Sequence, residues 1–177
     1  MGTRNLTMVI DQNGEKKVAQ YGQWDGYPSG VGSSILIFLK NEELFGKLKD
    51  NLSKVRFLDD DKDKEFIESY NKNSPKWSDE PDNRTDDQKK WFANYCHRDL
   101  AEEVLTNIAK STDEEIILIN REETAKSGGM VEYSYLINLK ENTFGVYNYI
   151  DQDPIKVYSL NALPSEEAFL LELEGCE

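Results

Sequence analysis

Apolar and polar residues alternate near the start of the chain, which predicts β-strands there. In residues 3–10, every second residue from Leu6 is apolar, so one face of an extended backbone would be hydrophobic. The Asn13-Gly14 pair predicts a tight turn, after which residues 17–22 return as the second strand of a hairpin.

The last third of the chain has the same kind of pattern. Residues 116–119 form a short apolar run, and residues 156–160 are expected to be an edge segment. Between them, residues 130–139 and 143–150 are expected to pair across a short polar turn. A second antiparallel hairpin is therefore predicted toward the C-terminus.

The chain between these hairpins carries apolar residues at helical spacing. Asn41 is a candidate N-cap for a helix with an apolar stripe at Leu44, Leu48 and Leu52. Thr85 and Gln88 have the spacing of a capping box. Further helices are expected over 29–39, 61–71, 99–108 and 164–173.

The order of strands, helices and strands predicts an α+β fold. We expect a single domain over residues 1–177, in which an antiparallel sheet from the N-terminal and C-terminal hairpins encloses a central helical segment. Residues 59–89 are the most polar part of the chain, and we expect them to be rich in loops.

Charge is distributed unevenly. The chain of 177 residues has a net charge of −13. Residues 1–58 carry 8 Lys/Arg and 6 Asp/Glu, whereas residues 59–177 carry 13 and 28, a net charge of −15. This field disfavours direct binding to nucleic acid or to an anionic membrane and favours a basic partner. It is equally typical of an ordinary acidic surface.

Composition points to a protein of a reducing compartment. The opening residues lack the apolar run of a signal peptide, and no segment approaches the roughly 18 apolar residues of a membrane span. Cys96 and Cys176 give no disulfide framework. A cytoplasmic protein is expected.

Several familiar chemistries are absent from the sequence. Gly30-Val31-Gly32 lacks the spacing of a dinucleotide fingerprint, and there is no phosphate-binding loop. His97 is the one histidine, so a zinc site of ordinary ligand spacing cannot be assembled, and no metal or cofactor is expected. Neighbouring helical residues point apart, so Cys96 and His97 do not suggest a catalytic dyad.

The most distinctive segment is residues 18–32, which run from the second predicted strand into the loop after the hairpin and combine glycines, a proline and three aromatic rings. Asp25 sits between Trp24 and Tyr27, where ring packing could raise its pKa and make it an acid or a base; alternatively it caps loop amides. The aromatic rings could stack a ligand, seal an interface or anchor the core. The candidate ligand site, with Arg4 and Arg98 as charge partners, comprises Arg4, Gln23, Trp24, Asp25, Tyr27 and Arg98.

The segments 1–7 (Met-Gly-Thr-Arg-Asn-Leu-Thr) and 19–30 (Ala-Gln-Tyr-Gly-Gln-Trp-Asp-Gly-Tyr-Pro-Ser-Gly) resemble a family of small phage and prophage proteins. Shorter versions of the same motifs are found in fungal proteins. The resemblance is specific over the first 32 residues and weaker at Arg98-Asp99 and in the last hairpin. It supplies no catalytic residues. It implies a phage anti-defence role, of the anti-CRISPR kind that acts against type II RNA-guided nucleases.

Two functional hypotheses follow. In the first, the protein acts in the cytoplasm of a bacterial host and inhibits a defence nuclease, or another basic protein, by binding its basic surface. Its acidic contact residues would be Asp59, Asp60, Asp61, Asp79, Glu80, Asp82, Asp86 and Asp87. In the second hypothesis, the loop Gln23–Gly32 binds a small molecule or nucleotide, or forms the active site of a hydrolase. In the first hypothesis, desolvated acidic side chains that face Lys and Arg of the partner would speed association and add specificity.

Overall fold

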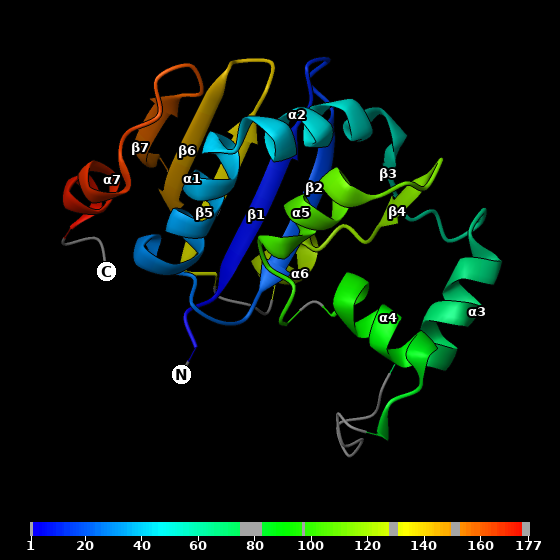
Figure 1. Cartoon of the computed structure of the whole chain (residues 1–177). Helices are drawn as coiled ribbons and strands as arrows, with labels where there is room; N and C mark the ends of the chain where they lie inside the picture. Colours follow the sequence, from blue (N-terminus) through cyan, green and yellow to red (C-terminus); the bar gives the residue numbers. More distant parts are fainter. Residues whose placement is uncertain (1, 75–82, 97, 128–130, 150–152, 175–177) are drawn as a thin grey trace.

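The structure, a computed structural model, describes residues 2–74, 83–96, 98–127, 131–149 and 153–174. Its centre is a five-stranded sheet in the order β2-β1-β5-β6-β7 (Figure 1). The strands are β1 (Asn5–Ile10), β2 (Lys16–Gly22), β5 (Tyr133–Asn138), β6 (Thr143–Asn148) and β7 (Pro154–Ser159). The α+β fold is confirmed.

Helices cover one face of this sheet (Figure 1). They are α1 (Ser33–Lys40), α2 (Glu42–Asn51), α5 (Glu103–Lys110) and α7 (Glu166–Leu173). A π-helical turn, η1 (Pro28–Gly32), leads into α1, and a 3₁₀ turn, η2 (Leu52–Lys54), follows α2. The main core lies between these helices and the sheet, with Ile35, Leu105, Tyr135, Phe144 and Phe169 all fully buried.

The opposite face of the sheet has a smaller core at β1 and β2. Leu6, Met8, Ala19 and Tyr21 pack there with Ala125 of helix α6 (Glu122–Ser127). Both faces of β1 are therefore covered, and Asn5, Thr7 and Val9 on its helix-covered face are fully buried. The alternation in the sequence predicted the strand, but it gave no sign that its polar face would be buried as well.

The sheet is mixed, which corrects the prediction of an antiparallel one. Both predicted hairpins are present, β1 with β2 and β5 with β6, and β7 extends the second. The hairpins meet through β1 and β5, however, and these strands run parallel, with Asn5 beside Tyr133. Parallel neighbours need a long crossover, which the central helices provide. Alternation marks strands and does not specify their partners.

Two further strands form a separate small sheet. They are β3 (Val55–Phe57) and β4 (Ile116–Leu118), which pair in parallel. The apolar run at 116–119 predicted β4, whereas β3 and helix α6 were not expected from the sequence. β3 is only three residues long, and its pairing depends on a partner about sixty positions away.

The helix caps agree with the sequence except before α5. Asn41 accepts a hydrogen bond from the Leu44 N–H at 3.0 Å, and Thr85 and Gln88 form both hydrogen bonds of a capping box. Asp99 was expected to cap the next helix, but α5 begins only at Glu103. The Asp99 side chain instead binds the Trp24 indole.

The polar segment contains two helices that stand away from the sheet, α3 (Lys64–Asn73) and α4 (Asp86–Tyr95) (Figure 1). We call this pair the α3–α4 arm. Phe66, Tyr70, Trp91 and Tyr95 join its helices, with ring centroids 5.2 to 6.3 Å apart. The arm thus has its own aromatic core.

Candidate functional site

The loop after β2 has a fixed shape because its backbone is bonded to three other parts of the chain. The Gln23 N–H donates to the Arg98 carbonyl at 2.9 Å, and the Gly26 N–H donates to the Thr3 carbonyl at 3.0 Å. The buried Tyr135 hydroxyl donates to the Gly26 carbonyl at 2.7 Å. The loop is therefore built as a rigid element on the end of the sheet.

Close backbone approach explains the glycine at position 30. A Cβ added there would lie 2.3 Å from the Asp25 carbonyl oxygen, which accepts a hydrogen bond from the Val31 N–H. Asp25 itself has a φ of +50°, and Ala101, across the cleft described next, has a φ of +38°. Such conformations are uncommon for non-glycine residues and gather at functional sites.

A cleft of about 400 Å³ opens between this loop, the first turn of α1 and the segment before α5. We call it the Trp24 cleft. Its volume falls within the range of small ligand sites, about 300–1,000 Å³. The lining residues are Trp24, Asp25, Gly30, Val31, Ser34, Arg98, Asp99, Ala101, Glu102 and Glu103.

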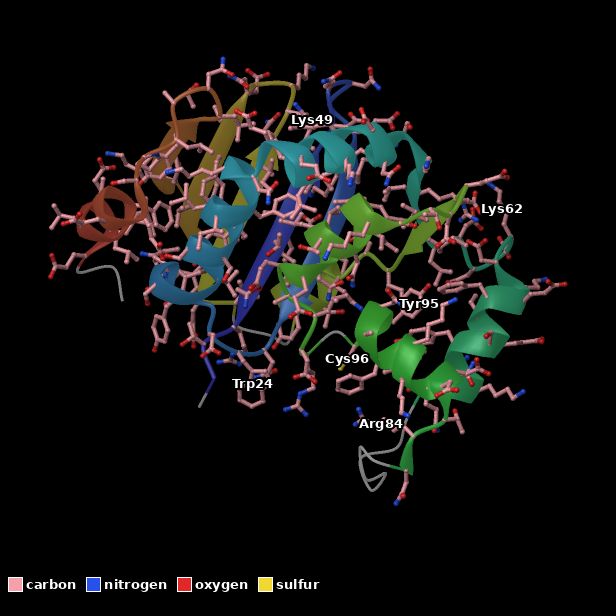
Figure 2. All side chains as sticks on the ribbon, viewed as in Figure 1. Trp24, Lys49, Lys62, Arg84, Tyr95 and Cys96 are labelled. Carbon is pink, nitrogen blue, oxygen red and sulfur yellow. The ribbon has the colours of Figure 1, made fainter. Side chains whose placement is uncertain are left out.

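Trp24 forms an exposed aromatic wall of the cleft, with 45% of its surface accessible (Figure 2). Its indole Nε1 donates to Asp99 Oδ1 at 3.0 Å, which fixes the ring orientation. The Arg98 guanidinium lies 5.5 Å from the ring centroid, within the range of a cation–π contact. The indole is thus already positioned against one cation.

Carboxylates dominate the electrostatics of the Trp24 cleft. Among the described lining residues, Asp25, Asp99, Glu102 and Glu103 are acidic and Arg98 is the one cation. Burial raises the pKa of Glu102, and the negative charges of Glu103 and Asp25 add to this shift, while a hydrogen bond with Ser34 opposes it. The cleft therefore combines one partly buried acid with exposed acids and suits a cation better than an anion.

The structure brings together only part of the ligand site expected from the sequence. Trp24, Asp25 and Arg98 line the cleft. Gln23, Tyr27 and Arg4 do not: the Gln23 side chain accepts from the Tyr21 hydroxyl, Tyr27 packs beside Tyr133, and Arg4 pairs with Glu132 at 3.5 Å.

Asp25 is exposed rather than enclosed by rings, and its carboxylate has no hydrogen-bond partner within the described part of the chain. Ser34 was missed because it lies beyond the loop in the first turn of α1, and Glu102 and Glu103 were missed because they belong to a helix start about eighty residues later. Asp99 could have been found from the weak resemblance at Arg98-Asp99.

Five of the eight acidic residues expected to form a contact surface are described, and they lie in α4 or in the segment before α3. Asp60, Asp61 and Asp87 are exposed there, whereas Asp59 pairs with Lys62 at 3.3 Å and Asp86 with Lys89 at 3.7 Å. Asp79, Glu80 and Asp82 lie outside the described residues.

Asp63, in the same polar run, is a structural residue. It is buried and receives two hydrogen bonds from Arg56, each 2.6 Å long. Asp59, Asp63 and Asp86 are therefore offset by neighbouring cations.

Comparison with known proteins gives no relative: no protein-family model, curated protein or solved structure matches this chain. Within the described ranges, no helix is both long and apolar enough to cross a membrane. No group of His, Cys, Asp and Glu side chains in the same ranges could hold a metal ion.

Proposed function

We propose that this protein binds a basic partner protein and that the Trp24 cleft accepts a Lys or Arg side chain from that partner. The observation that carries the proposal is the lining of the cleft, where four carboxylates and an exposed indole face a single arginine. An aromatic face beside carboxylates is a favourable environment for a guanidinium or ammonium group.

The overall charge supports the same conclusion. Residues 59–177 carry a net charge of −15, so the protein would attract a basic surface before close contact forms. Electrostatic complementarity of this kind raises association rates and disfavours partners of the wrong charge. The acids on the α3–α4 arm would then contribute long-range attraction, while the Trp24 cleft would provide the anchoring contact.

The resemblance to phage and prophage proteins supplies the first partner to test, the nucleic-acid-binding surface of a bacterial type II RNA-guided nuclease. Such a surface is rich in Lys and Arg because it binds phosphates. An inhibitor that occupies it would act in the host cytoplasm, bind no nucleic acid itself and need no cofactor. Inhibition of DNA cleavage would follow from simple competition for this surface.

Two matched double variants test the proposal. Asp25→Asn with Asp99→Asn removes two charges from the cleft; asparagine can still accept the Trp24 hydrogen bond and tolerates the positive φ at position 25. Asp60→Asn with Asp61→Asn removes the same charge from exposed positions near the α3–α4 arm. Binding to a type II nuclease and cleavage inhibition are measured from about 50 to about 500 mM salt.

We expect the cleft variant to lose about tenfold or more in affinity and the arm variant much less, with wild-type binding weakening as salt rises. A larger loss of affinity in the arm variant than in the cleft variant would show that the anchoring contact lies on the arm. No binding and no inhibition by the wild-type protein at micromolar concentration would refute this choice of partner.

A second function is favoured by the state of Glu102. Burial raises the pKa of this carboxyl, while Asp25 is exposed in the same cleft. Two neighbouring carboxyl groups in different environments, one partly buried and one exposed, are the arrangement that acid–base hydrolases use. A neutral or cationic substrate fits better than a nucleotide, because the cleft acids would repel phosphates. Turnover of nitrophenyl esters or glycosides that Glu102→Gln abolishes would establish this function, and no turnover of either class would oppose it.

A further inference from the structure

A second hollow lies on another part of the molecule, between strand β4 and helix α4. It has a volume of about 210 Å³. Consecutive residues Glu115–Leu118 line one side, which indicates that the exposed backbone edge of β4 forms this wall, since a strand face would present alternate residues. Val104 and Ile108 of α5, both buried, line it as well. We call this hollow the β4 groove.

The outer edge of β4 has unused backbone hydrogen-bonding groups. The Leu118 carbonyl accepts a hydrogen bond from the Leu58 N–H, so the backbone groups of Leu118 point toward β3. Because backbone groups alternate along a parallel strand, the N–H and carbonyl of Ile117 point away from β3. Neither forms a hydrogen bond to any residue that the structure describes. In the small sheet, the only described neighbour of β4 is β3.

The far wall of the groove belongs to the α3–α4 arm. Phe66 and Tyr95 contribute apolar surface there, and their ring centroids lie 5.4 Å apart. Figure 2 labels Tyr95 on α4. A strand edge on one side and a helix with apolar side chains on the other form the geometry in which an extended peptide adds a strand to a sheet. The volume is below the usual range for drug-sized ligands, about 300–1,000 Å³, and suits side chains of a chain lying along the edge.

Charge identifies the peptide further. Residues 113–115 are three consecutive acids at the start of β4. Glu115 is held by Arg56 at 2.7 Å, whereas Asp113 lines the groove and is exposed. Burial raises the pKa of Tyr95, and the charge of Asp113 adds to this shift, which is consistent with that carboxylate facing the groove. Of the lining residues that the structure describes, Lys90 is the one cation.

We propose that the β4 groove binds an extended peptide segment of a partner protein, paired with the outer edge of β4. The segment alternates apolar residues, which enter the groove, with polar ones, and it carries a Lys or Arg beside Asp113. This inference rests on the β4 edge and is independent of the Trp24 cleft.

Ile117→Pro is the decisive variant, because it removes the outward N–H and leaves the hydrogen bonds to β3 in place; proline is tolerated at such edge positions. A phage-displayed library of random dodecapeptides is selected on the wild-type protein and counter-selected on Ile117→Pro. Synthetic peptides of the enriched sequences are then measured by fluorescence polarisation, with and without N-methyl groups on alternate amides.

We expect alternating sequences with Lys or Arg, whose affinity falls by about tenfold or more on Ile117→Pro, on N-methylation and on Asp113→Lys. Glu114→Lys is the matched control, with the same charge change at a side chain that does not line the groove, and it should change affinity much less. Asp25→Asn with Asp99→Asn should leave peptide binding unchanged, so this inference and the proposed function can fail separately.

Three results would overturn the inference. One is an enriched set that binds wild type and Ile117→Pro equally. Another is full binding by N-methylated peptides, a measurement on the wild-type protein that stays decisive if Ile117→Pro fails to fold. The third is a dimer of the protein alone, seen by light scattering, that Ile117→Pro dissociates, because a second copy would then occupy the groove.

Discussion

Two hydroxyl groups on neighbouring strands offer a sharp test of how the loop is attached to the sheet. Thr7 on β1 and Tyr135 on β5 are register partners, and both side chains are fully buried. The Tyr135 hydroxyl donates to the Gly26 carbonyl at 2.7 Å, whereas Thr7 Oγ1 is buried and has no partner among the described residues. Removing each hydroxyl should therefore change stability in opposite directions.

The magnitudes follow from the fate of each polar group. Tyr135→Phe keeps the ring packed beside Phe144 but leaves the buried Gly26 carbonyl unpaired, which should destabilise the protein by about 1–3 kcal/mol. Thr7→Val exchanges an unpartnered hydroxyl for a methyl group of similar size, and the lost desolvation cost should stabilise the protein by about 1 kcal/mol.

Urea unfolding followed by circular dichroism measures both variants against wild type. We expect the urea midpoints of the two variants to move in opposite directions at an unchanged m-value. In thermal unfolding, each kcal/mol corresponds to about 2–4 °C in Tm for a chain of this size. A destabilised Thr7→Val protein would show that this hydroxyl is bonded in the folded state. An unchanged Tyr135→Phe protein would show that the loop does not depend on this hydrogen bond.

Three further outcomes are expected. Glu102→Gln should stabilise the protein at pH 8 and have little effect at pH 4. Burial raises the pKa of Glu102 above its unfolded value, so the wild-type protein loses stability as pH rises through the raised pKa. Equal effects of the substitution in urea unfolding at both pH values would contradict this. Asp63→Asn should destabilise the protein at pH 7. Arg56 lowers the pKa of Asp63 to about 2, so the difference in unfolding free energy between wild type and variant should vanish as pH falls through that value. A difference that persists in acid would refute the ion pair. Asn41→Ala should cost about 1 kcal/mol in urea unfolding through loss of the cap on α2, and no cost would mean that the cap is dispensable.

The sequence determined the local structure of this protein where neighbouring residues decide it. The alternation after Thr3, the turn at Asn13-Gly14 and the caps at Asn41 and Thr85 act over a few residues, so both hairpins and several helix starts were predictable. The unusual composition of residues 18–32 likewise indicated a loop of fixed shape, although its first five residues belong to β2 and the loop begins at Gln23. Trp24 and Asp25 could be singled out on this basis alone.

Only the tertiary structure decided which elements meet. Parallel pairing of β1 with β5, the burial of Thr7 and the pairing of β3 with β4 each depend on chain crossovers that no local pattern specifies. The same holds for the Trp24 cleft, which combines the loop with Glu102 from a helix start about eighty residues later. Acids spread along a sequence give only a net charge. Their concentration around one indole, on which the proposed cation site rests, is a consequence of the fold.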